Sequence, residues 1–171
     1  MRKPDGFTLV EMLVTVAILA ILLGLAAPSF TAYILNTKLT TQANALSADL
    51  QAARSEASRR NVTVVVCASS DNSTCNTSAS WSDKRIVFAD SDGNNAYGAG
   101  DTMIRTSDGP VLPQVITGPG SSIQFRSTGQ PSTGAISFTI CDNRSGNFGV
   151  MVRVEPTGRS SVVPNSPQHC N

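Results

Sequence analysis

An apolar run near the N-terminus, from Phe7 to Ala27, constrains this chain more than any other feature. Its 21 residues include a single charged side chain, Glu11. As an α-helix the run would be roughly 31 Å long at ~1.5 Å per residue, which is about the thickness of a bilayer core. Arg2 and Lys3 precede it, and basic residues before a span keep that end cytoplasmic. The pattern predicts a membrane span over residues 7–28, with the rest of the chain outside.

Two features of this run differ from an ordinary secretory signal. Gly6 lies before the apolar residues, whereas the small residues of a signal-peptide cleavage site follow them. Glu11 places a carboxylate in hydrocarbon, where it is costly unless it finds a partner. Both residues therefore require a functional explanation.

The segment 6–11, Gly-Phe-Thr-Leu-Val-Glu, resembles the type III signal of type IV pilins and type II secretion pseudopilins. In that family a prepilin peptidase cuts after the glycine and methylates the new N-terminal residue. The resemblance implies cleavage between Gly6 and Phe7, with residues 1–6 as a leader peptide. It also implies that Glu11 pairs with the N-terminal amine of a neighbouring subunit and sets the register between helices. An alternative is an ordinary signal cut near residues 24–26, which would release a soluble periplasmic protein.

A second, amphipathic stretch covers residues 29–60. Pro28, between the two stretches, is expected to bend or end the helix. Apolar residues then recur at spacings of three or four, as on one face of a helix: Ala32, Leu35, Leu39, Ala43, Leu46, Leu50, Ala53 and Ala57. The other face carries Lys38, Thr41, Gln42, Asp49, Arg54 and Glu56. The pattern predicts a helix from Phe7 to about Arg60, roughly 80 Å long, whose second half covers a globular domain.

Residues 61–171 are expected to form a β-rich head. Short β-branched runs alternate there with turn residues, which is typical of antiparallel sheets. The expected strands are 62–68, 85–89, 102–105, 122–125, 135–141, 148–154 and 160–163. The predicted fold class is α+β, with the long N-terminal helix packed on an antiparallel β-sheet head.

The order of motifs in the head resembles the minor pseudopilin H and FimT/FimU-type minor pilins. These motifs are Trp81 and the segments 85–90, 101–105, 125–129 and 156–159. The resemblance implies a subunit at or near the tip of a type IV pilus or type II secretion pseudopilus, where it supports assembly. Implied partners are the prepilin peptidase and other major and minor pilins or pseudopilins. Implied locations are the inner membrane, with a periplasmic head, and then the filament.

Four cysteines lie beyond the predicted span, which suggests an oxidising compartment and two disulfides. Three pairings are possible. We favour Cys67–Cys75 and Cys141–Cys170, because a bridge across a turn and a tethered terminus need the least rearrangement of the chain.

An Asp-rich segment follows the second expected strand. Asp90, Asp92, Asn94 and Asp101 occupy positions 1, 3, 5 and 12 of an EF-hand-like count, which makes calcium binding an alternative. Position 6 is Asn95 where that loop requires glycine, and position 12 is aspartate where it has glutamate. A hairpin loop with a polar surface is the preferred interpretation.

Arg144, Arg153 and Arg159 are concentrated near the C-terminus, where few acidic residues accompany them. FimT-type pilins that serve DNA uptake are similar here and carry a Gly-Arg-x-Arg motif. This chain has Gly-Arg-Ser-Ser over residues 158–161 and lacks the second arginine. A DNA receptor at the pilus tip is therefore the alternative function, with one fewer phosphate contact than the motif provides.

Enzymatic function is not expected. The only histidine, His169, lies two residues from the C-terminus beside Cys170, which is a poor position for a general base. The sequence contains no phosphate-binding loop, paired carboxylates or G-x-S-x-G motif. Its formal net charge of +1 provides no global field for attracting polyanions. No cofactor is expected.

Overall fold

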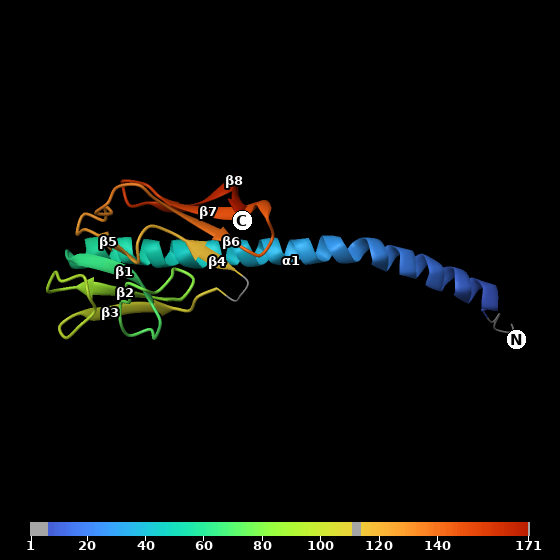
Figure 1. Ribbon diagram of the computed structural model, residues 1–171, viewed down its shortest axis with the longest axis horizontal. Coiled ribbons are helices and arrows are strands. Elements are labelled where there is room, and N and C mark those ends of the chain that lie inside the picture. Colours follow the sequence, from blue (N-terminus) through green and yellow to red (C-terminus); the bar gives the residue numbers. More distant parts are fainter. Residues whose placement is uncertain (1–6, 111–113, 171) are drawn as a thin grey trace, which may run out of the picture. The chain divides into compact units, whose positions relative to one another are not determined.

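The computed structural model describes residues 7–110 and 114–170, so the leader and the expected cleavage residue Gly6 lie outside the described part. The chain divides into two compact units, one up to Thr37 and one from Lys38 onward. One helix, α1 (Leu9–Arg60), contributes to both units (Figure 1). α1 continues through Pro28, so this proline does not end the helix, and the predicted single helix to Arg60 is confirmed.

The second unit contains eight strands. They are β1 (Thr63–Ser69), β2 (Lys84–Asp90), β3 (Thr102–Ser107), β4 (Val115–Thr117), β5 (Ser122–Phe125), β6 (Ile136–Cys141), β7 (Gly146–Val154) and β8 (Ser160–Cys170). They form two antiparallel sheets, with strand orders β3-β2-β1-β5 and β4-β6-β7-β8. The α+β class and the antiparallel head are confirmed.

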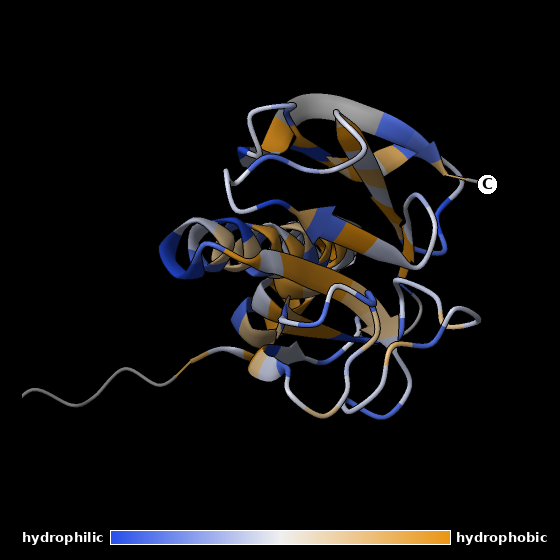
Figure 2. Cartoon of the chain, turned by 90° about the vertical axis from the view of Figure 1, so that its left-hand side faces the viewer, coloured by the Kyte–Doolittle hydropathy of each residue, from blue (hydrophilic) through white to orange (hydrophobic). Residues whose placement is uncertain are grey.

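The C-terminal half of α1 lies between the two sheets (Figures 1 and 2). Six residues of its predicted apolar face have no exposed surface: Leu39, Ala43, Leu46, Leu50, Ala53 and Ala57. They share one core with residues from both sheets, among them Val64, Phe125 and Phe138. Burial of each leucine contributes roughly 1.5–3 kcal/mol relative to exposure. The helix therefore packs its apolar face against both sheets, while its polar flank stays exposed.

Trp81, in the loop before β2, anchors the β4 side of this core. Its indole N–H donates to the carbonyl of Gly120 at 2.8 Å, and its ring packs edge-on against Phe138 at 5.0 Å between centroids. A Cβ on Gly118 would overlap the Phe138 ring, so only glycine fits there. The tryptophan noted in the sequence is thus a core residue whose one polar atom is satisfied.

Two β elements differ from the sequence prediction. β4 was not expected, because its three residues are too few to show an alternating pattern. β8 extends to Cys170, whereas the last expected strand ended at residue 163. Prolines interrupt this segment, but β8 is the edge strand of its sheet, where a missing N–H is tolerated. The register between β7 and β8 shifts twice along this part.

Asp49 is the third departure from expectation. The sequence placed it on the polar face of the helix, but its side chain is fully buried and pairs with Arg85 of β2. It lies one position before Leu50, at the border of the apolar face, where β2 and β3 of the β3-β2-β1-β5 sheet close over it. The periodicity of the sequence locates the centre of the buried helix face. It does not show how far the sheet extends beyond that face and which polar residues it covers.

Candidate functional site

The N-terminal end of α1 holds the residues expected to act in processing and assembly. Phe7 is 76 % exposed. The backbone N–H of Glu11 donates to the Thr8 hydroxyl at 3.3 Å, so Thr8 caps the helix and Glu11 occupies its first turn. A carboxylate there interacts favourably with the helix dipole. No other described side chain bonds to this carboxylate, which leaves it accessible to a partner.

Apolar side chains between Leu9 and Leu23 are largely exposed. In the described part of the chain, no helix is long and apolar enough to cross a membrane, so the span expected over 7–28 is not confirmed.

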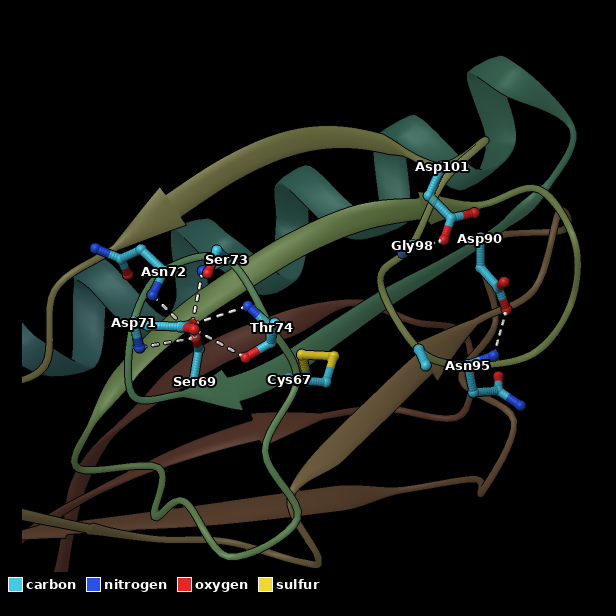
Figure 3. Close-up of a disulfide and its surroundings, with 12 residues drawn as sticks. Cys67, Ser69, Asp71, Asn72, Ser73, Thr74, Asp90, Asn95, Gly98 and Asp101 are labelled. Carbon is cyan, nitrogen blue, oxygen red and sulfur yellow. Dashed lines mark hydrogen bonds between the residues drawn. A yellow bond between two sulfur atoms is a disulfide. The ribbon is translucent and has the colours of Figure 1, made fainter.

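The structure pairs Cys67 with Cys75 and Cys141 with Cys170, which is the pairing favoured from the sequence. The first bridge closes a loop over the outer face of β1 and β2 (Figure 3). A small cluster that includes Phe88 and Tyr97 lies on that face, with ring centroids 5.5 Å apart. The second bridge fixes the end of β8 to the end of β6. The first disulfide therefore holds a loop against one sheet, and the second joins two strands of the other sheet.

Asp71 shapes the disulfide loop (Figure 3). Its Oδ1 accepts the backbone N–H groups of Ser73 and Thr74, both at 2.8 Å, and the Ser69 hydroxyl at 3.0 Å. The N–H of Ser73 contributes most to holding the pKa of Asp71 well below its ordinary value. No role was expected for this residue, although the run Asp-Asn-Ser-Thr over 71–74 consists of turn-forming residues.

The Asp-rich loop brings together three of the four residues in the alternative calcium set. Carboxylate oxygens of Asp90, Asp92 and Asp101 lie within 4.8 Å of one another. Asn94 is instead bonded within the loop, with its amide donating to Asp92 at 2.7 Å. Oxygen donors of this type suit calcium.

These carboxylates already have a structural task. Asp90 accepts the backbone N–H groups of Asn95 (Figure 3) and of Gly93. Asp101 accepts those of Ser91 and Gly98. Burial raises the pKa of Asp90. Together these bonds hold the loop in a conformation in which Tyr97 packs against Phe88. Stabilising this loop is a sufficient reason for the three aspartates to lie close together.

Two of the three C-terminal arginines are engaged with acidic neighbours. Arg144 pairs with Asp142 at 2.6 Å and stacks on Phe148, with 4.4 Å from guanidinium to ring centroid. Burial alone would raise the pKa of Asp142, but the hydrogen bonds from Arg144 hold it below its ordinary value. Arg153 pairs with Glu155 at 3.1 Å.

The three arginines do not form one patch. Arg144 precedes β7 and Arg153 lies near its end, so roughly 25–30 Å of extended strand separates them at ~3.3 Å per residue. Arg159 alone has no acidic partner among the described residues. The DNA-receptor alternative therefore gains no support from the structure.

Two glycine turns meet beside α1, and they belong to motifs noted separately in the sequence. The backbone N–H of Gly129 donates to the backbone carbonyl of Arg126, and that of Gly158 donates to the backbone carbonyl of Glu155, both at 2.7 Å. Both glycines have positive φ, and a Cβ on Gly158 would overlap the Gly129 carbonyl oxygen. A Cβ added to Gly129 or to Gly158 would lie 3.3 Å or 3.2 Å, respectively, from a side-chain carbon of Arg54.

Arg54 was therefore missed as a site residue. Its sequence signal was that of a solvated cation on a polar helix face, and no local pattern relates it to turns 75 or more positions away. The motifs 125–129 and 156–159 were visible, but their contact with each other was not.

Residues 42–158 match the family described as Type II transport protein GspH. The chain belongs to the GspH family. Residues 1–27 match the prokaryotic N-terminal methylation motif. The GspH match ends at Gly158 and so includes both turn glycines, the C-terminal part of α1 and seven of the eight strands. The predicted membership of the minor pilin and pseudopilin group is confirmed.

Solved structures show the same fold. The chain resembles the type IV minor pilin FimU of Pseudomonas aeruginosa strain PAO1, with 22 % identity and a TM-score of 0.63, over 81 % of this chain and 99 % of FimU. It also resembles the minor pseudopilin EpsH of the type 2 secretion system of Vibrio cholerae. That match has 9 % identity and a TM-score of 0.53, over 74 % of this chain and 96 % of EpsH. At these identities the likeness concerns the fold alone. Comparison with curated proteins finds no match.

Proposed function

We propose that this GspH-family chain is a minor subunit of a type IV pilus or type II secretion pseudopilus that enters the filament at or near its tip and supports assembly. The observation that carries the proposal is the pairing of two matches on one chain. The GspH match covers residues 42–158, which include most of the head, and the methylation motif covers residues 1–27.

The precursor is held at the inner membrane by its N-terminal segment, with its head in the periplasm. The prepilin peptidase cuts between Gly6 and Phe7 and methylates Phe7. Exposed apolar side chains along the first turns of α1 support this step, because a soluble protein rarely leaves so continuous an apolar surface uncovered. Lipid covers that surface first, and helices of major and minor pilins or pseudopilins cover it in the filament.

Glu11 then aligns the subunit. Its exposed carboxylate, in the first turn of α1, is free to accept a hydrogen bond from the methylated amine of a neighbouring Phe7. In a water-poor helix bundle an unpaired carboxylate is strongly unfavourable, so pairing selects one register. The family is one of structural pilins and pseudopilins, and we assign no reaction to the chain.

Mass spectrometry of the protein from sheared filaments tests the proposal. We expect a mature chain that begins at Phe7 and carries one added methyl group. A start near residues 24–26 would contradict it. Gly6→Leu should leave uncut precursor in the membrane fraction, with Gly24→Leu as the matched control that is cut normally.

Placement at the tip is tested by immunogold labelling of an epitope-tagged chain. We expect gold at filament ends. Labelling along the whole length would show a subunit of the shaft and contradict the tip assignment.

A further inference from the structure

A polar hollow of about 670 Å³ opens beside the two glycine turns. One side comes from an exposed flank of α1 and the other from the beginning of β8 and the residue before it. It is lined by Gln51, Arg54, Ser55, Ser58, Arg159 and Ser160. Two of these residues are cationic and none is acidic.

The two guanidinium groups of this hollow lack counter-ions within the described residues. Glu56, the nearest acidic residue along α1, is occupied by Arg59 and Arg60, each at 2.6 Å. Most other arginines of the head are paired with an aspartate or a glutamate. Arg54 and Arg159 therefore place two uncompensated positive charges at one concave surface.

The hollow is also held in shape. The carbons of the Arg54 side chain pack under Gly129 and Gly158, whose close contact leaves no room for a Cβ on Gly158. The Gln51 amide donates to the Ser47 hydroxyl at 3.2 Å and the Ser160 carbonyl at 3.4 Å. A side chain fixed by packing loses less entropy when it binds a ligand.

We propose that this hollow receives an acidic side chain of a neighbouring filament subunit, whose carboxylate pairs with Arg54 and Arg159. Guanidinium groups match carboxylates with two parallel hydrogen bonds, and the surrounding hydroxyls add donors. The identification of the partner rests on the proposed function, because only a filament subunit has other subunits at its head.

A single carboxylate fits this hollow better than a nucleic acid does. Duplex binding sums many phosphate contacts along an extended surface. Here only two cations converge, in a concavity, and Arg144 and Arg153 are already paired.

The test uses the full-length protein in neutral detergent micelles and a blocked four-residue peptide with two central glutamates. We expect NMR shifts confined to residues 51–58 and 158–160. Arg54→Gln and Arg159→Gln should each weaken binding by about fivefold, the upper range for exposed ion pairs. Ser55→Asp keeps both arginines but supplies a carboxylate, and it should abolish the shifts.

Lys38→Gln is the matched control, because it removes an exposed cation of the same helix away from the hollow, and it should bind as the parent does. Equal weakening by Lys38→Gln, equal binding of a peptide with two glutamines, or binding of a 12-base-pair duplex without binding of the acidic peptide would each overturn the proposal. The Arg159 side chain is exposed, so that variant remains informative if Arg54→Gln fails to fold. If the chain enters filaments but does not bind the peptide, the proposed carboxylate site is wrong and the proposed function still stands.

Discussion

Asp49 of α1 and Arg85 of β2 form an ion pair, 3.0 Å between Oδ2 and Nε, in which neither side chain has any exposed surface. Arg105 reaches the other carboxylate oxygen at 2.9 Å, and the Ser107 hydroxyl donates to it at 2.7 Å. One carboxylate on the central helix is thus bonded to two strands of the same sheet. The pair fixes how α1 is positioned along that sheet. If the helix slid along the sheet, both charges would remain buried but lose their partner.

Removal of that carboxylate should destabilise the head strongly. Asp49→Ala leaves the Arg85 charge buried without a partner, and we expect a loss of about 3–5 kcal/mol in unfolding free energy. Denaturant unfolding followed by the fluorescence of Trp81, the only tryptophan, measures it. Asp108→Ala, at an exposed position, is the control and should change little.

The double variant Asp49→Leu/Arg85→Met should recover most of this loss, because it removes both charges together. One Arg85 nitrogen, Nη2, is already buried without a partner among the described residues. A double variant as unstable as Asp49→Ala would show that the pair is not an isolated charge contact.

Gly158→Ala should destabilise the head more than Gly134→Ala. Both glycines have φ of 82°, so the backbone strain is the same in each variant and is expected to be about 1 kcal/mol. Only at position 158 does the new methyl group overlap another backbone, at Gly129, while Gly134 has open space. The difference between the two unfolding free energies isolates the contact between the turns. Equal losses would mean that the turns move apart freely.

The disulfide from Cys141 to Cys170 should stabilise the head more than that from Cys67 to Cys75. Their sequence separations are 29 and 8 residues. Loop-closure entropy then gives about 3.5 and about 2.5 kcal/mol. Paired Cys→Ser variants, compared by denaturant unfolding, measure the order. A larger loss in the Cys67→Ser/Cys75→Ser protein would contradict the prediction.

Asp71 should make the stability of the head depend on acidic pH. Its pKa is lower in the folded chain than in the unfolded chain, so its contribution is present above the unfolded value and is lost as pH falls through the folded one. The loss begins at about pH 4, the ordinary aspartate range. The amide of Asp71→Asn cannot titrate. The melting temperature of this variant should therefore fall less than that of the parent as the pH is lowered from neutral to below about pH 4. Parallel pH profiles of the two proteins would contradict this.

Glu11→Ala should leave cleavage and head folding unchanged but reduce entry into filaments. The carboxylate bonds to no other described side chain within its own chain, so its loss acts only between subunits. A competition assay with wild-type chain, quantified by mass spectrometry of sheared filaments, measures incorporation. Thr15→Ala, in the same exposed part of the helix, is the control. Incorporation of Glu11→Ala at the wild-type level would remove the register role.

Local patterns in the sequence predicted much of this protein. Helical periodicity identified the buried face from Leu39 to Ala57, and β-branched runs located most strands, because these signals depend on neighbours a few positions apart. The order of residues around Gly6 and Glu11 indicated the family, since processing signals are linear. Loop length favoured the two disulfides that the structure contains.

Only the tertiary structure decided which polar residues act together. Asp49 belonged to the polar face in sequence and became buried because two strands close over the border of that face. Arg54, Gly129 and Gly158 carry no mutual signal, since their contact depends on how two sheets pack on one helix. β8 remains a strand despite its prolines because it has an edge position, and a strand's place in a sheet is set by its partners and not by its own residues.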